Sequence, residues 1–162
     1  MKKYDIVVVG GGHAGIEAAS AGARMGCSVA LLTMDRFALG RMSCNPAIGG
    51  TAKGHLVREI DALGGVMGKI ADKTGIQFRM LNKSKGPAVW SPRCQSDRKL
   101  YSEEAYKIIN PTNNLEILED SAIGVITENG KVIGVKTKSG EDILCKALVL
   151  SSGTFLNGLM HT

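Results

Sequence analysis

The chain has 162 residues, of which 44% are hydrophobic and 22% are charged, a composition typical of one globular domain with its own core. It contains no run of about 18 apolar residues that could span a bilayer, and the basic start, Met1-Lys2-Lys3, lacks the long apolar stretch of a secretory signal. We therefore expect a cytoplasmic protein with no membrane segment. The net charge of +5 is compatible with a polyanionic partner, although such an excess more often serves solubility.

A glycine-rich turn follows the first predicted strand. The apolar residues 6–9 run directly into the sequence Gly10-Gly11-Gly12-His13-Ala14-Gly15. In such a turn the first glycine permits the sharp bend, the third lets the main chain approach a phosphate, and the last lets the following helix pack close to the strand. The free N–H groups of that helix then face an anion. These residues are predicted to bind a pyrophosphate; the alternative is an ordinary strand, turn and helix without a ligand.

The residues around this turn predict a complete βαβ unit over residues 4–33. Residues 4–9 are β-branched and apolar, residues 13–25 are rich in alanine and end at Gly26, and residues 28–33 form a second strand. This length is usual for a dinucleotide-binding βαβ unit.

The middle of the chain, residues 34–110, lacks this regular alternation. We expect a functional loop, two helices, a strand, a second loop and a third helix, at residues 34–50, 51–63, 66–73, 76–81, 82–92 and 94–109. The first of these helices has Leu56, Ile60 and Leu63 on one face. Thr51 stands where it would cap the N-terminus of that helix.

The last third of the chain predicts an antiparallel β-meander. Short strands are expected at residues 115–118, 122–127, 132–137, 142–144 and 147–150. Asn129-Gly130 and Ser139-Gly140 form turns between them, because glycine tolerates the positive φ of hairpin turns. The last strand runs into a small-residue turn at 151–154. A plain nicotinamide-binding Rossmann domain would instead continue to alternate strands and helices.

A meander in place of a crossover helix resembles the flavin-binding fold of glutathione reductase and its relatives. The resemblance implies a Rossmann-like α/β domain that binds FAD, with Gly153 in a turn near the dinucleotide and Ala122 where main-chain groups read adenine. Many relatives carry an acidic residue at the end of the second strand, where it binds the adenosine ribose. Thr33 occupies that place here, with Asp35 two residues later; a hydroxyl makes a weaker contact than a carboxylate.

Longer motifs resemble one family over nearly the whole chain. They occur in the same order, at residues 42–50, 53–57, 61–65, 75–79, 85–88 and 95–98. They resemble the FAD-dependent large subunit of the tRNA wobble-uridine carboxymethylaminomethyl-modification enzyme. Members of that family are much longer, so we expect an N-terminal fragment, a partial FAD-binding domain over residues 1–162. Within it we expect the βαβ unit, an active-site loop with a helical insertion, and a meander with a return strand at residues 4–33, 34–110 and 115–154.

The resemblance implies a reaction and its participants. The family adds an aminomethyl or carboxymethylaminomethyl group to carbon 5 of the wobble uridine of tRNA, together with a GTPase partner. NADH is the implied reductant, methylenetetrahydrofolate is the implied one-carbon donor, and the full-length protein is expected to be a homodimer. Two alternatives stay open: a folate-dependent tRNA uridine-5 methyltransferase, and a flavin-binding module without catalysis.

Cys44 is the candidate catalytic thiol. Carbon 5 of uracil is a poor nucleophile, and a thiolate that adds to carbon 6 would make carbon 5 reactive. A nearby helix start and Lys53 would lower the pKa of this thiol. Whether Cys44 attacks uracil, protonates an intermediate or engages the flavin stays open, and so does the alternative of a small buried residue in a tight turn.

A basic segment between residues 79 and 99 is the candidate tRNA contact. It holds six basic residues, one acidic residue and Trp90, a mixture that can contact RNA phosphates and stack an unpaired base. Arg93 and Arg98 are the best candidates; the alternative is a solvated surface with Trp90 as a packing anchor.

The remaining cysteines and histidines are given structural roles, except for Cys94 and His13. Cys27 is expected in the core, Cys145 is expected to be structural at the close of the meander, Cys94 is left without a role, and His55 is expected to be structural. His13 would pack beside the pyrophosphate or donate to it. The spacing of these residues predicts no metal site.

Overall fold

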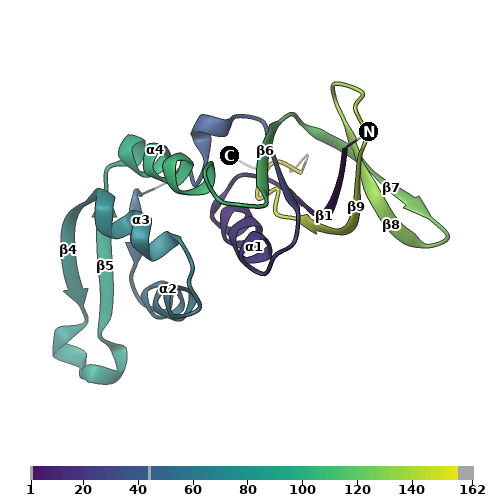
Figure 1. Ribbon diagram of the computed structural model, residues 1–162. Helices are drawn as coiled ribbons and strands as arrows, with labels where there is room; N and C mark the ends of the chain where they lie inside the picture. Colours follow the sequence, from purple (N-terminus) through teal and green to yellow (C-terminus); the bar gives the residue numbers. More distant parts are fainter. Residues whose placement is uncertain (1, 44, 157–162) are drawn as a thin grey trace, which may run out of the picture.

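Figure 1 shows the computed structural model of the chain, which describes residues 2–43 and 45–156. In these residues the strands form a larger sheet in the order β6-β2-β1-β9-β8-β7 and a smaller sheet in the order β3-β5-β4. The larger sheet consists of β1 (Lys2–Val9), β2 (Val29–Thr33), β6 (Leu115–Glu119), β7 (Ala122–Glu128), β8 (Lys131–Thr137) and β9 (Ile143–Leu150). The smaller sheet consists of β3 (Ala47–Gly49), β4 (Gly75–Leu81) and β5 (Ser91–Ser96).

Four helices accompany the two sheets in the described part of the chain. They are α1 (His13–Arg24), α2 (Lys53–Ala62), α3 (Met67–Thr74) and α4 (Arg98–Ile109), with short 3-10 turns η1 (Arg36–Ala38), η2 (Lys83–Lys85) and η3 (Pro87–Val89). No helix within residues 2–43 and 45–156 combines the length and the apolar character needed to cross a bilayer.

The larger sheet has the parallel arrangement that the sequence predicts. Strand β1 pairs in parallel with β2 and β9, and β2 pairs in parallel with β6. Strands β7 and β8 extend the sheet in antiparallel fashion from β9. The predicted Rossmann-like α/β fold with an antiparallel meander is thereby confirmed. The carboxyl ends of β1, β2, β6 and β9 meet at one edge, the usual place for a ligand in such sheets.

The predicted strands at 142–144 and 147–150 are one continuous strand, β9. Its first residues pair with β8, where Leu144 lies opposite Gly134, while the whole strand runs parallel to β1 from Ile143 to Leu150. The expected break does not occur because β9 pairs with β1 along its length, with Cys145 opposite Tyr4 and buried in the core.

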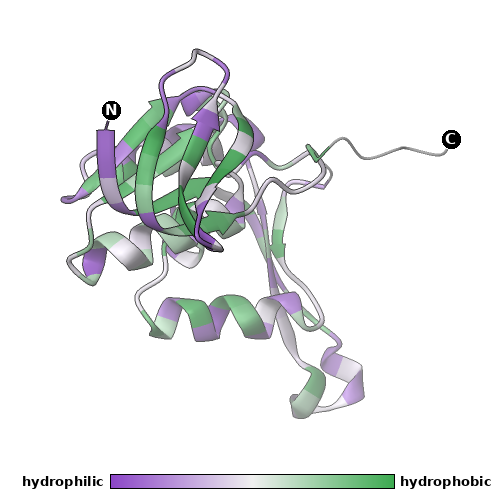
Figure 2. Ribbon diagram, turned by 90° about the vertical axis from the view of Figure 1, so that its right-hand side faces the viewer, coloured by the Kyte–Doolittle hydropathy of each residue, from purple (hydrophilic) through white to green (hydrophobic). Residues whose placement is uncertain are grey.

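The core lies on both faces of the larger sheet. Successive residues of a strand point to opposite faces, and Val8 accordingly belongs to the cluster under α1 while Val7 belongs to the cluster on the other face. Ile16 of α1 and Leu31 of β2 are completely buried in the first cluster. The apolar centre of this sheet is visible as green strands in Figure 2.

Residues 91–96 form strand β5, and the prediction of a helix from residue 94 is wrong by four residues. The strand forms because it pairs with both β3 and β4. Helix α4 begins after Asp97, whose carboxylate accepts hydrogen bonds from the N–H groups of Lys99 and Leu100, both at 2.8 Å. A side-chain acceptor at this position stabilises a helix start.

Helix α2 begins at Lys53, so Thr51 does not cap it. The residue before the helix is Ala52, with φ of 66° and no side-chain cap. The hydroxyl of Thr51 instead accepts a hydrogen bond from the Asn82 side-chain amide at 3.0 Å. The helix buries Gly54, and of the apolar face predicted from the sequence Leu56 and Leu63 are exposed, at 55% and 83%, whereas Ile60 is half-buried.

Gly15 is the position where α1 crosses β1, and we expect Gly15→Ala to destabilise the protein. A Cβ at this position would lie 1.8 Å from the carbonyl oxygen of Gly10 and 2.8 Å from the Ser151 hydroxyl. We expect the loss of unfolding free energy to be about 1–3 kcal/mol, the usual cost of overpacking. Thermal or urea unfolding measures it.

The matched control is Gly12→Ala. Gly12 has a φ of −72°, and a Cβ there would meet no atom within 4 Å. Equal stability of the two variants would contradict the packing argument.

Candidate functional site

The glycine turn is fixed by the ends of two neighbouring strands. The N–H of Gly10 donates to the carbonyl of Leu32 at 2.8 Å, and the N–H of Ser151 donates to the carbonyl of Val9 at 2.8 Å. Gly10 has a φ of +107°, and a Cβ there would lie 2.4 Å from the carbonyl oxygen of Ser151. Only glycine satisfies both the positive φ and the close approach, so the sequence places the turn where β2 and β9 end.

The amide groups that follow this bend are available to a ligand. Gly12 precedes α1 and provides no side-chain cap, and the N–H groups of residues 11–14 have no acceptor among the described residues. A Cβ at Gly12 would meet no atom of the described residues within 4 Å, so the space beside this glycine is open. Free amides at the positive end of a twelve-residue helix suit a phosphate. The turn therefore fits the diphosphate of a dinucleotide.

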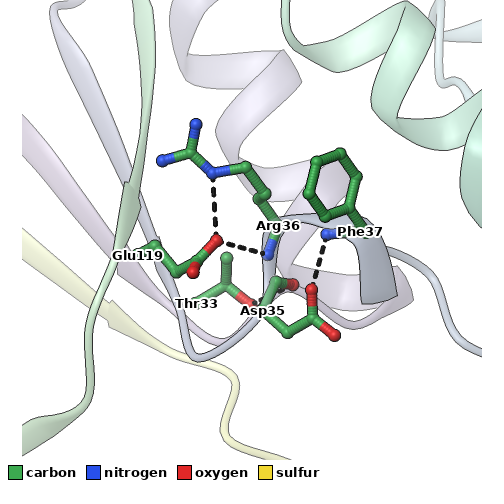
Figure 3. A network of polar contacts seen from close by, with 5 residues as sticks. All are labelled: Thr33, Asp35, Arg36, Phe37 and Glu119. Carbon is green, nitrogen blue, oxygen red and sulfur yellow. Dashed lines mark hydrogen bonds and ion pairs between the residues drawn. The ribbon is translucent and has the colours of Figure 1, made fainter.

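Polar groups gather at the adjoining carboxyl end of β2 (Figure 3). The hydroxyl of Thr33 donates to the carbonyl of Asp35 at 3.3 Å, and the Asp35 carboxylate accepts from the N–H of Phe37 at 2.8 Å. Glu119, which lies opposite Thr33 in the next strand, accepts from the side chain of Arg36 at 3.0 Å. Two carboxylates therefore lie beside the threonine that replaces the expected acid.

Glu119 is a residue that sequence reasoning did not single out. The sequence places Glu119 directly after the predicted strand 115–118, which is the one indication it gives. The parallel pairing of β2 with β6 is what puts this residue beside Thr33.

Ala122 and Gly153 each follow, by two residues, a residue that is hydrogen-bonded to the carboxyl end of a strand of the larger sheet. The N–H of Asp120 donates to the carbonyl of Thr33 at 2.9 Å, and Ala122 opens β7 two residues later. Gly153, with a φ of +58°, follows two residues after Ser151, whose hydroxyl donates to the carbonyl of Val9.

His13 is half-buried beside an aromatic ring and near the charge of Lys53. Its ring centroid lies 5.5 Å from that of Tyr101, and its Nε2 atom is buried with no hydrogen-bond partner among the described residues. Burial, followed by the charge of Lys53, lowers the pKa of His13. The pKa of His13 therefore lies below the ordinary histidine value of about 6.5. The imidazole is accordingly neutral near pH 7.

Lys53 reaches back from α2 toward the preceding strand, β3. Its Nζ donates to the carbonyl of Ala47 at 2.9 Å, and burial lowers the pKa of its ammonium group. Cys44 lies outside the described residues, so its catalytic role stays a prediction. The described cysteines, Cys27, Cys94 and Cys145, are free thiols.

The two arginines predicted to contact tRNA lie on different elements. Arg93 is half-buried in β5, opposite Arg79 of β4, whereas Arg98 is exposed at the first position of α4. Trp90 is 43% exposed, and its indole N–H donates to the carbonyl of Lys83 at 3.2 Å.

The parallel sheet, the meander and the open glycine turn define a Rossmann-like nucleotide-binding domain. The family model described as "Glucose inhibited division protein A" matches residues 5–162. The chain belongs to this family.

Curated relatives and a solved structure agree with the family match. A protein of Flavobacterium psychrophilum named tRNA uridine 5-carboxymethylaminomethyl modification enzyme MnmG is 55% identical over 99% of this chain and 26% of its own length. A protein of the same name from Thermodesulfovibrio yellowstonii is 57% identical over 99% of this chain and 26% of its own. A crystal structure of Aquifex aeolicus GidA matches 96% of this chain and 26% of that one, with 54% identity and a TM-score of 0.93. The chain thus spans about a quarter of the length of these relatives.

The environment of His13 generates a pH prediction. Because burial lowers its folded pKa below the unfolded value, the unfolded state takes up a proton first as pH falls below about 6.5, and the stability of the folded state declines. NMR titration of the imidazole should therefore give a pKa below about 6.5. The variant His13→Gln should lose less stability than the unmodified protein on acidification.

His55→Gln is the matched control, since His55 is exposed on α2. A His13 resonance that titrates at or above the ordinary value would overturn the assignment of a neutral, buried ring.

Proposed function

We propose that this chain forms the FAD-binding part of an enzyme that modifies carbon 5 of the wobble uridine of tRNA. The observation that carries the proposal is the set of free amides at the glycine turn, in a chain more than half identical to proteins named as tRNA uridine modification enzymes. The wider division follows the sequence: a βαβ unit at residues 4–33, an active-site region at 34–110, and the meander with its return strand at 115–154.

The glycine turn would hold the diphosphate of FAD. The N–H groups of residues 11–14 would donate to its oxygens, and Gly15 would keep α1 close enough to direct them. His13, neutral and beside Tyr101, would pack next to the diphosphate without adding a charge. Bound FAD would supply the electron transfer that a one-carbon reduction requires.

The carboxyl end of β2 would hold the adenosine part of the cofactor. Thr33, whose hydroxyl contacts the main-chain carbonyl of Asp35, would offer acceptors to the ribose hydroxyls together with the carboxylates of Asp35 and of Glu119 in the next strand. Main-chain groups at Ala122 would read the adenine, and Gly153 would lie along the dinucleotide.

Cys44 is proposed as the thiol of the active site. The positive end of α2 and Lys53 are features that lower a thiol pKa and raise the share of reactive thiolate. A thiolate can add to carbon 6 of uracil and make carbon 5 nucleophilic. Attack on uracil, proton donation and contact with the flavin all remain roles that this thiol could fill.

The remaining participants are those that the resemblance to the family implies. NADH would reduce the flavin, methylenetetrahydrofolate would donate the one-carbon unit, and a GTPase partner would act with a homodimer of the complete polypeptide in the cytoplasm. Arg93 and Arg98 are the proposed contacts to tRNA phosphates.

We expect Gly12→Val to abolish flavin binding without unfolding the protein. The Cβ methyl groups would occupy the space that the diphosphate needs, while a Cβ at Gly12 meets no protein atom within 4 Å. The bound flavin of the purified complete polypeptide is measured by its visible absorbance and its bleaching with dithionite.

Gly124→Val on β7 is the control, because a Cβ there approaches, within the described part of the chain, only Lys136, at 3.8 Å. Normal flavin content in Gly12→Val would refute the placement of the cofactor.

We expect Cys44→Ser to eliminate modified uridine while the protein keeps its flavin, since a serine hydroxyl is a far weaker nucleophile than a thiolate at neutral pH. The assay supplies tRNA, the GTPase partner, methylenetetrahydrofolate and NADH, and measures nucleosides by mass spectrometry. Cys27→Ser is the control, because Cys27 packs against the core. Full activity in Cys44→Ser would remove this thiol from the mechanism.

A further inference from the structure

Four polar side chains share one face of the small sheet: Gln77, Arg79, Arg93 and Gln95. In the antiparallel pairing of β4 with β5, Gln77 lies opposite Gln95 and Arg79 lies opposite Arg93. Residues directly opposite one another project from the same face of a sheet, and so do residues two apart along one strand. The four side chains therefore form two adjacent cross-strand pairs, which we call the Arg–Gln face.

The Arg–Gln face points away from the helices that cover the sheet. Cys94, between Arg93 and Gln95, faces α3, where its Sγ donates to the carbonyl of Ala71 at 3.4 Å. Alternation along β5 then turns its two neighbours to the opposite side. In Figure 1, α3 lies directly beside β5.

The Arg79–Arg93 pair is unfavourable unless an anion joins it. Like charges directly opposite in a sheet repel each other, and among the described residues neither arginine forms an ion pair or a side-chain hydrogen bond. The side-chain amides of Gln77 and Gln95 likewise form no hydrogen bond among the described residues. The two arginines and two glutamines are held in fixed positions by the strand pairing and are free to bind a ligand. A phosphate with a polar group attached to it would suit all four side chains.

The chemistry of these groups matches a nucleotide. A guanidinium fork binds phosphate oxygens with two parallel hydrogen bonds, and a glutamine amide offers both a donor and an acceptor to a base edge or a ribose hydroxyl. Proteins read RNA sequence mostly in unpaired nucleotides, whose base edges are accessible.

We propose that the Arg–Gln face binds one unpaired nucleotide of RNA, with Arg79 and Arg93 on its phosphodiester and Gln77 and Gln95 on its base or ribose. The inference rests on the proposed function and specifies where the substrate nucleotide is held. It adds Arg79 and the two glutamines to Arg93, and it does not involve Arg98 or Trp90.

The test measures binding of a fluorescent anticodon stem–loop RNA to the complete polypeptide by anisotropy in phosphate-free buffer. Arg79→Gln and Arg93→Gln should each weaken binding about five- to tenfold, and each should lower the slope of log affinity against log salt by about 1. Lys131→Gln, which removes one exposed charge from the β7–β8 hairpin, should leave both quantities unchanged.

The glutamines are tested with a second RNA. Gln77→Leu and Gln95→Leu should weaken binding of the stem–loop but not of a duplex of equal length without unpaired nucleotides. Inorganic phosphate and uridine monophosphate are titrated separately; strong binding of free phosphate, with RNA binding unaffected by the arginine changes, would overturn an RNA site in favour of a small anion.

Thermal unfolding separates binding from structure. Because the arginines repel each other, Arg79→Gln should have an equal or higher Tm than the unmodified protein while its RNA affinity falls. A lower Tm with unchanged RNA affinity would show a structural role and overturn the inference. Unchanged affinity in all four variants of a protein that still modifies tRNA would overturn it and leave the proposed function standing. An unmodified protein that does not bind the RNA would refute both.

Discussion

The close contact between Gly10 and Gly15 is the constraint on which the rest of the structure depends. The carbonyl of Gly10 lies so near the Cα of Gly15 that no side chain fits between them, and Ser151, the residue after β9, closes the same contact. This approach fixes the direction of α1 against the parallel sheet. The helix therefore presents its first amides at the edge where the strands end, and the turn has the geometry of an anion site.

That edge collects groups from segments far apart in the sequence. Thr33 ends β2, Glu119 ends β6, and the hydrogen bond from Asp120 to Thr33 ties the start of the meander to the same place. The small sheet, in contrast, exposes paired arginines at a cost in repulsion. Both regions leave hydrogen-bonding groups without partners among the described residues, and such groups are typical of sites that a ligand completes.

The sequence predicts the parts of the fold in which local pattern and tertiary packing agree. The apolar run, glycine turn and alanine-rich helix of residues 4–33 appear as expected, because each element has a local hydrophobic pattern and glycines mark where it ends. Strand β5 was missed because residues 94–96 adjoin a true helix and become a strand only through pairing with β3 and β4. The same holds for the site, where local pattern predicts some residues and tertiary pairing decides others. The glycine turn can be predicted from the sequence, but the pairing of Arg79 with Arg93 depends on a strand register that the sequence does not determine.

Hydrogen–deuterium exchange of the backbone amides at residues 11–14, followed in the complete polypeptide with and without FAD, tests the central claim most directly. If these amides hold the diphosphate, their exchange slows strongly when FAD is bound, while amides at the tip of the β7–β8 hairpin exchange at the same rate in both states. Equal exchange at residues 11–14 in the two states would contradict the account.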